Sequence, residues 1–306
     1  MLMARDKQIA ILVPCKNEAV TIRDVVEGFR RAVPGCTVYV YDNNSTDDTA
    51  KIARDAGAIV GRETRAGKGN VVRRMFSEID ADVYVMVDGD NTYDASQADL
   101  LINKVVGEGI DMAVGARIGA TKKHQRAGHA FGNRMFNVLY SRLFGQDFSD
   151  IFSGYRAFSR RFVKSFPAVS AGFEIETELS VHASQLRLPV AEIDLPYQDR
   201  PEGSESKLST FRDGARILKT IIVLLKEYKP LYFFGGISLL GMLLSVMIAI
   251  PVFLQYMQTG HVEAYATAVL ATGVMIVSML SMTAAVVLDS IRRMRAEIKR
   301  MFYNLT

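Results

Sequence analysis

The chain has 306 residues, of which 49% are hydrophobic, and a formal net charge of +4 at pH 7. This modest charge, with no basic patch interleaved with aromatic residues, argues against nucleic acid as a partner. Charged residues are common over roughly the first 230 positions and almost absent from two later windows, which argues against a single soluble domain and favours a soluble domain followed by a membrane anchor.

Strand and helix patterns alternate along the amino-terminal part of the chain. Short apolar runs predict strands at 9–13, 37–41, 58–60 and 83–87, and helices are expected at 19–31, at 46–55 and from about residue 69. Continuously apolar strands such as 83–87 are typical of a sheet that is covered on both faces. The alternation predicts an α/β fold with a mostly parallel sheet and right-handed connections.

Polar residues follow three of these expected strands. They are Pro14, Cys15, Lys16, Asn17 and Glu18 after the first, Asp42, Asn43, Asn44 and Ser45 after the second, and Asp88, Gly89 and Asp90 after the fourth. In open α/β sheets, ligands bind beyond the carboxyl ends of the strands. Three polar turns at one edge therefore predict a binding pocket.

Asp88 and Asp90 flank Gly89 directly after the run 83–87. Residues two apart in an extended segment project to the same side, so these carboxylates suit a shared divalent cation. Alternatively, one carboxylate binds a metal and the other binds a sugar hydroxyl. Asp-Gly is also common in turns that bind nothing, so these interpretations stay open.

A glycine-rich loop at 65–70 places Lys68 at an expected helix start. Backbone N–H groups and the helix dipole favour phosphate at such a position. The spacing is not that of a P-loop, and a plain loop is the alternative interpretation.

Two further sets of titratable residues have less specific patterns. Glu174 and Glu176 have the form of paired carboxylates that hydrolyse sugars, but we expect the polar start of a helix, which the helix dipole favours. His124 and His129 lie in a basic loop, where we expect surface or lipid-headgroup contact rather than a metal site.

Two windows, 232–256 and 264–288, contain no Lys, Arg or Asp, and each is near the length of about 20 residues that crosses a bilayer. Their connector also lacks Lys and Arg, whereas basic residues flank the pair. These are Lys226 and Lys229 before the first window, and Arg292, Arg293 and Arg295 after the second. This asymmetry predicts a multi-pass protein of the cytoplasmic membrane, with the soluble domain and both termini in the cytoplasm.

The amino-terminal residues 1–7 lack a signal-peptide pattern, so we expect no export of the soluble domain. A cytosolic domain gives Cys15 and Cys36 no reason to form a disulfide. Both are expected as free thiols.

Residues 208–230 predict an amphipathic helix between the soluble domain and the first window. One face carries Arg212, Arg216, Lys219 and Lys226, and another carries Phe211, Leu218, Ile222 and Leu225. We expect this helix to lie on anionic membrane lipid, the alternative being a solvent-facing helix that packs on the domain.

The expected organisation is a soluble domain at 1–207, the amphipathic helix at 208–230, a two-helix transmembrane hairpin at 231–290 and a basic cytoplasmic tail at 291–306. Small residues in the first span, Gly235, Gly236 and Gly241, suit packing between subunits, so a homo-oligomer is a further hypothesis.

Six motifs, taken in order, resemble those of family 2 glycosyltransferases with the GT-A fold. The motifs are Val13–Glu18, Tyr41–Asp47, Asp88–Asp90, Val114–Arg117, Asp150–Arg156 and Arg200–Leu208. The resemblance is closer to the branch that glycosylates polyprenyl phosphate, which includes dolichol-phosphate mannose synthases and bacterial polyprenyl-phosphate glucosyltransferases. It spans roughly residues 9–225 and implies a GT-A catalytic domain with a Rossmann-like, mostly parallel sheet.

The resemblance also implies roles for individual residues. It assigns Pro14, Asn17, Glu18 and Asp42 to the nucleoside, Lys68 to the surroundings of the nucleotide, and Asp88 and Asp90 to the donor and its Mg²⁺ or Mn²⁺, with Asp90 as the direct metal ligand. Arg117, Arg200, Ser206 and Lys207 are expected at the acceptor phosphate, and Asp150 is expected to orient the acceptor or to pair with an arginine.

The chain departs from the family's motifs at three places. Asn43 replaces an acidic residue, which leaves the base and sugar open, and Thr92 stands where some relatives have a glutamine ligand, so water would complete the metal's coordination. One extra residue precedes Ser206 and Lys207, which makes their alignment less certain than that of Arg200.

These motifs imply metal-dependent, inverting transfer of one sugar from a UDP- or GDP-sugar to polyprenyl phosphate at the cytoplasmic membrane face. A lipid phosphate is already anionic near neutral pH, so no general base is required. A processive polysaccharide synthase is excluded because its Gln-x-x-Arg-Trp motif needs a tryptophan and the chain has none. A catalytically silent scaffold that senses nucleotide sugars, or an enzyme with another lipid acceptor, stays an alternative.

Overall fold

The computed structural model describes residues 7–118, 148–167, 175–198, 222–223 and 225–305. The chain divides into two compact units, Met1–Gly214 with Lys299–Thr306, and Ala215–Ile298. Several residues singled out above lie outside the described ranges. They are His124, His129, Glu174, Arg200, Ser206, Lys207, Phe211, Arg212, Arg216, Leu218 and Lys219.

The first unit is built on a sheet in which seven strands are described, in the order β3-β2-β1-β4-β6-β5-β7. The strands are β1 (Ile9–Cys15), β2 (Thr37–Asp42), β3 (Ile59–Arg62), β4 (Val83–Met86), β5 (Met112–Ile118), β6 (Arg156–Ser159) and β7 (Val190–Pro196). All neighbours pair in parallel except β6, which is antiparallel to β4 and β5. The expected mostly parallel sheet is confirmed.

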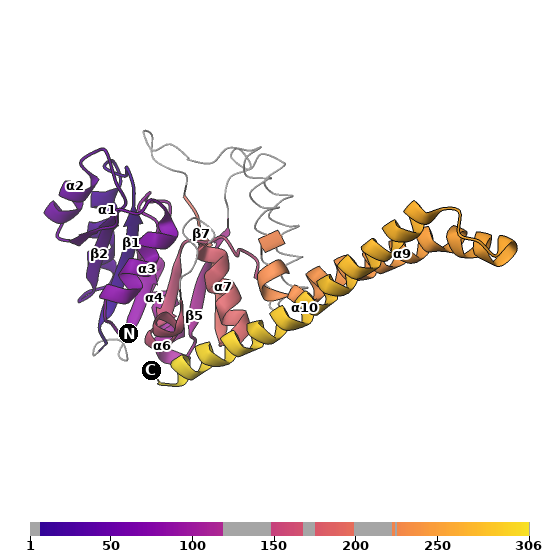
Figure 1. Cartoon of the computed structure of the whole chain (residues 1–306). Helices are drawn as coiled ribbons and strands as arrows, with labels where there is room; N and C mark the ends of the chain where they lie inside the picture. The colour runs from indigo at the N-terminus through magenta and orange to yellow at the C-terminus, as the bar shows by residue number, and fades with distance from the viewer. Residues whose placement is uncertain (1–6, 119–147, 168–174, 199–221, 224, 306) are drawn as a thin grey trace. The chain divides into compact units, whose positions relative to one another are not determined.

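Helices connect these strands and pack against the sheet (Figure 1). They are α1 (Ile22–Ala32), α2 (Thr49–Asp55), α3 (Lys68–Glu78), the short 3-10 helix η2 (Ala95–Gln97), α4 (Ala98–Gly107), α6 (Arg160–Ser165) and α7 (Ile175–Leu186). The apolar face of α1 shows how the sequence specifies this packing. Ile22, Val25, Val26 and Phe29 recur at helical spacing and are all buried.

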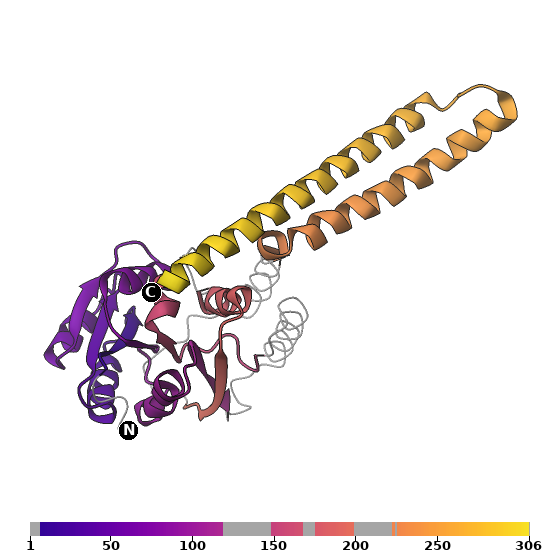
Figure 2. The same cartoon turned by 90° about the horizontal axis from the view of Figure 1, so that it is seen from below.

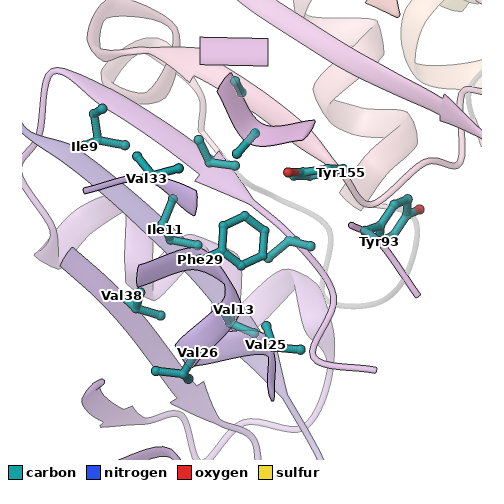
Figure 3. Packing of buried hydrophobic residues seen from close by; sticks show 14 of the residues in the cluster. Ile9, Ile11, Val13, Val25, Val26, Phe29, Val33, Val38, Tyr93 and Tyr155 are labelled. Atoms are coloured by element: carbon teal, nitrogen blue, oxygen red, sulfur yellow. The ribbon is translucent and has the colours of Figure 1, made fainter. Parts of the chain in front are cut away.

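Phe29 lies in the core beside the interior strand β1 (Figure 3). Its ring meets the ring of Tyr155 edge to face, with 6.0 Å between centroids. Ile11 and Val13 of β1 belong to the same cluster and are fully buried. Each such side chain contributes about 1.5–3 kcal/mol through burial, so this cluster holds β1 firmly in the interior of the sheet.

The strand register brings the expected polar turns to one edge. Cys15 at the end of β1 pairs with Asp42 at the end of β2, and Leu12 pairs with Met86 of β4. Backbone bonds continue this alignment, because Asn43 N donates to the carbonyl of Cys15 at 2.8 Å. Cys15 and Cys36 are both free thiols, as expected.

The second unit contains most of a helical hairpin, α9 (Pro230–Thr259) and α10 (Tyr265–Leu305), whose helices run side by side (Figure 2). Both are long and apolar enough to cross a membrane, with mean hydropathies of 2.5 and 2.0 in their most apolar windows. Only 11% and 17% of those windows are buried, whereas a core helix of a soluble protein is mostly buried. This pattern suits helices whose outer faces contact lipid.

Serine hydroxyls join the two helices of the hairpin. Ser238 Oγ donates to the carbonyl of Ser278 at 2.7 Å, and Ser245 Oγ donates to the carbonyl of Ala271 at 2.7 Å. Gly241 lies against Ser278, where a Cβ would overlap the hydroxyl. Small and hydroxylated residues thus bring the helices close together within the hairpin.

We expected a basic tail from residue 291, but α10 continues as a helix to Leu305, and its last residues belong to the first unit. There Tyr303 donates to the fully buried carboxylate of Asp111 at 2.7 Å, and its ring lies under the guanidinium of Arg161 at 5.0 Å from the centroid. Arg161 also binds Asp111 directly, with Nε 2.6 Å from Oδ1.

Tyr303→Phe is expected to lower the free energy of unfolding of the first unit by about 1–3 kcal/mol, because a buried carboxylate loses a donor. A thiol-reactive dye would follow thermal unfolding through exposure of the buried Cys15. The control is Tyr265→Phe at the other end of α10, where Tyr265 is 71% exposed. Equal melting temperatures for the two variants would contradict this role of Tyr303.

Candidate active site

The carboxylate of Asp90 is fixed by the turn that follows β4. Its side chain is buried, and Oδ1 accepts a hydrogen bond from the hydroxyl of Thr92 at 2.6 Å. Asn91 between them has φ of 56°, a left-handed conformation that asparagine adopts more readily than most residues. Thr92, considered above only as a lost ligand position, is therefore a residue that orients Asp90.

The carboxylate of Asp88 lies at the same turn, between Lys68 and the backbone of Gly154. Lys68 Nζ is 2.5 Å from Asp88 Oδ1. A Cβ on Gly154 would overlap Asp88 Oδ2 and lie 3.0 Å from its Cγ. A glycine is therefore needed at 154 for this carboxylate to keep its position.

Glu176 lies in the first turn of α7, which confirms the expected helix start for this residue. The sequence did not indicate that its side chain is buried, with Oε1 2.5 Å from Lys68 Nζ. Burial alone would lower the pKa of Lys68, but the carboxylates of Asp88 and Glu176 raise it above its ordinary value, so Lys68 stays protonated. Burial raises the pKa of Glu176, and Lys68 opposes that shift.

Four acidic residues gather around the buried thiol of Cys15. Burial raises the pKa of this thiol. Four carboxylates raise this pKa further, in decreasing order of effect those of Glu18, Asp88, Asp42 and Asp90. Cys15 Sγ also lies directly beneath the turn, where a Cβ on Gly89 would be 2.5 Å away. Acids that follow three different strands thus lie at one negatively charged edge.

Asn17 joins the first two polar turns. Its backbone N–H donates to Ser45 Oγ at 2.9 Å, and its side-chain oxygen accepts from Thr46 N at 2.8 Å. Asp42 is buried beneath them and accepts from Ser45 N at 3.2 Å. Glu18 N donates to Thr49 Oγ1 at 2.9 Å, so the turn after β1 is held against the turn after β2. Of the residues predicted for the nucleoside, Asn17, Glu18 and Asp42 therefore lie together.

Asn43 has a structural task that its sequence context did not indicate. Its side-chain nitrogen donates to the carbonyls of Glu63 at 2.9 Å and Arg65 at 2.8 Å, and its oxygen accepts from Gly67 N at 2.7 Å. All three contacts are in the loop that precedes Lys68. An aspartate could not donate to the two carbonyls, so the asparagine serves to fix this loop.

Arg117 and Asp150 form a bidentate ion pair, with Nε to Oδ2 at 2.6 Å and Nη2 to Oδ1 at 2.8 Å. Tyr197 lies beneath the guanidinium at 5.5 Å, and Glu192 accepts from Asp150 N at 3.0 Å. Burial alone would lower the pKa of Arg117, but the hydrogen bonds that Arg117 donates to Asp150 raise it. Of the two interpretations given for Asp150, the structure contains the pairing with an arginine.

The donor atoms at the edge suit Mg²⁺ or Mn²⁺ but do not enclose a metal by themselves. Within the described ranges, no group of three or more His, Cys, Asp or Glu residues is placed to hold a metal ion. Magnesium characteristically uses one or two carboxylates and completes its octahedron with water and substrate phosphate. Asp88 and Asp90 fit that mode of binding.

Solved structures with this fold include glucosyl-3-phosphoglycerate synthase from Mycobacterium tuberculosis, solved with Mn²⁺, UDP and glucosyl-3-phosphoglycerate. The TM-score is 0.61 and the sequence identity 23%, over 74% of this chain and 81% of the other. The mixed sheet with its acidic edge is thus the GT-A-like fold of glycosyltransferases.

Residues 10–166 match the family described as "Glycosyl transferase family 2". The glycosyltransferase AglJ of Haloferax volcanii is 37% identical over 236 residues, which are 75% of this chain and 76% of AglJ. A dolichyl-phosphate hexose transferase of the same organism is 28% identical over 214 residues, covering 70% and 92%. The chain belongs to glycosyltransferase family 2, as its motifs predicted.

Proposed function

We propose that this glycosyltransferase moves one sugar from a UDP- or GDP-sugar to polyprenyl phosphate. The observation that carries the proposal is the acidic edge, where Asp88 pairs with the ammonium of Lys68, whose side chain is 9% exposed, and Asp90 follows in the same turn. Two carboxylates for a divalent cation next to a lysine for phosphate are the groups that a nucleotide-sugar donor requires. The acceptor is supported by the two apolar helices and by the similarity to a dolichyl-phosphate hexose transferase.

On the donor side, Asp90 and Asp88 would hold Mg²⁺ or Mn²⁺, which supplies a Lewis acid that stabilises the charge of the leaving nucleoside diphosphate. Asn17, Glu18 and Asp42, with Pro14, would hold the nucleoside through the turns that they join. Lys68 places a permanent positive charge beside Asp88, where a diphosphate would lie.

On the acceptor side, the nucleophile is a phosphate oxygen that is already negative near neutral pH, so the site needs to orient it rather than deprotonate it. We assign this to Arg117, whose guanidinium Asp150 holds in place, together with Arg200, Ser206 and Lys207. A single displacement inverts the configuration of the sugar carbon. The balance of Lys226, Lys229 and Arg292 against a connector without Lys or Arg supports a cytoplasmic site, and the basic face of 208–230 supports contact with anionic lipid.

The test is transfer of radiolabel from a panel of UDP- and GDP-sugars to a butanol-extractable lipid, with purified protein, undecaprenyl phosphate and Mn²⁺ or Mg²⁺. We expect labelled lipid from one donor, and loss of the label with a chelator. If labelled product forms only with a different lipid, that lipid would replace polyprenyl phosphate as the proposed acceptor. Nucleotide binding without any product would favour the catalytically silent scaffold.

A further inference from the structure

Lys68 is held between two carboxylates that come from different elements. Its Nζ lies 2.5 Å from Asp88 Oδ1 and 2.5 Å from Glu176 Oε1. The side chains of Lys68 and Glu176 are 9% and 5% exposed, so the surrounding protein shields this pair from water. The contact joins the start of α3 to the start of α7, two helices that are far apart in the sequence.

In this cluster one ammonium faces two carboxylates. Removing a charge from water costs several kcal/mol unless an opposite charge compensates it. A single carboxylate would suffice to neutralise Lys68. The second has a clear use only if one of the two is needed elsewhere, and Asp88 is the one that belongs to the proposed cation site.

The hydrogen-bonding capacity of Lys68 leads to the same conclusion. An ammonium has three N–H donors, and Asp88 and Glu176 account for two of them. When Asp88 serves a cation, Glu176 remains as a partner that keeps the ammonium in place. The other donors then suit the oxygens of a diphosphate, for which charge-assisted bonds are strong.

We propose that Glu176 is a positioning residue for the donor diphosphate, which it serves by anchoring Lys68 independently of Asp88. This inference rests on the proposed function. Glu176 acts through Lys68 and takes no part in the reaction itself.

The test compares Glu176→Gln with Glu178→Gln in the full-length protein. Glu178 is the matched control because it lies on the same helix, is also buried and undergoes the same change. Calorimetry in Mn²⁺ would measure binding of UDP, GDP, uridine and guanosine. We expect Glu176→Gln to weaken binding of whichever nucleoside diphosphate the wild type binds by about tenfold, which is the effect of one charge-assisted hydrogen bond. Binding of the nucleoside should not change. Glu176→Asp, which keeps the charge, should recover part of the loss.

Unchanged nucleoside diphosphate binding in Glu176→Gln would overturn the inference and leave Glu176 as a structural partner of Lys68. Equally weakened binding of the nucleoside and of the nucleoside diphosphate would also overturn the inference, because the effect would not depend on the phosphates. A wild-type protein that binds neither UDP nor GDP would overturn the proposed function and this inference with it. The two failures are therefore distinguishable.

Discussion

Asp90→Asn is expected to reduce transfer of sugar to lipid by about 10²–10³-fold, the loss typical of one group that stabilises transition-state charge. The variant keeps the size of the side chain and an oxygen that can accept the hydrogen bond from Thr92 Oγ1. In the protein with Asp90 this bond is 2.6 Å long. It removes the negative charge that a divalent cation requires. Electron paramagnetic resonance of Mn²⁺ would report the loss of binding separately from the loss of transfer.

Asp94→Asn is the matched control for this experiment. Asp94 lies four residues further on, and its carboxylate caps η2 by accepting from Ser96 N at 2.8 Å. Asparagine caps helices as well as aspartate does, so activity and Mn²⁺ binding should stay close to wild type. An Asp90→Asn enzyme that keeps both full activity and Mn²⁺ binding would show that Asp90 is not the metal ligand.

The first four strands and the acidic edge were predictable because their signals are local. The apolar run 83–87 contains β4, and two carboxylates spaced around Gly89 follow this run directly. In a parallel sheet the carboxyl ends of strands share an edge, so the turns after β1, β2 and β4 could be placed together before any contact was known.

The features that were missed depend on partners that are distant in the sequence. Glu176 has the local context of a helix start, and its partner Lys68 lies 108 positions away. Tyr303 is in a segment whose charge indicated a tail, and its partner Asp111 lies 192 positions away. Periodicity and charge patterns carry no information about such pairs, because either residue alone is compatible with an exposed surface.

Strand β6 was missed for a related reason. It begins with Arg156, a charged residue that apolar patterns exclude from a core, yet this side chain is fully buried. The guanidinium donates to the carbonyls of Ile151 at 2.6 Å and Ser153 at 2.9 Å, and to Ser180 Oγ at 2.8 Å. The buried guanidinium is tolerated because these acceptors satisfy its N–H groups. The fold brings the acceptors together from different parts of the chain.

Gly154→Ala is expected to weaken Mn²⁺ binding by about 10–100-fold, the range seen when residues that orient metal ligands are changed. The new methyl group would overlap Asp88 Oδ2 and lie 3.2 Å from Oδ1, so the carboxylate has to move. The end of a side chain moves at little cost to folding, and the melting temperature should therefore change little while the cation site is distorted.

Gly107→Ala is the control, because a Cβ at Gly107 would meet nothing within 4 Å. It should match the wild type in melting temperature, Mn²⁺ binding and transfer. If Gly154→Ala also matched the wild type in all three, Asp88 would tolerate displacement, and Asp90 would be the carboxylate that holds the cation. A loss confined to Gly154→Ala would instead show that Asp88 also serves the cation site, since the new methyl group lies against this carboxylate.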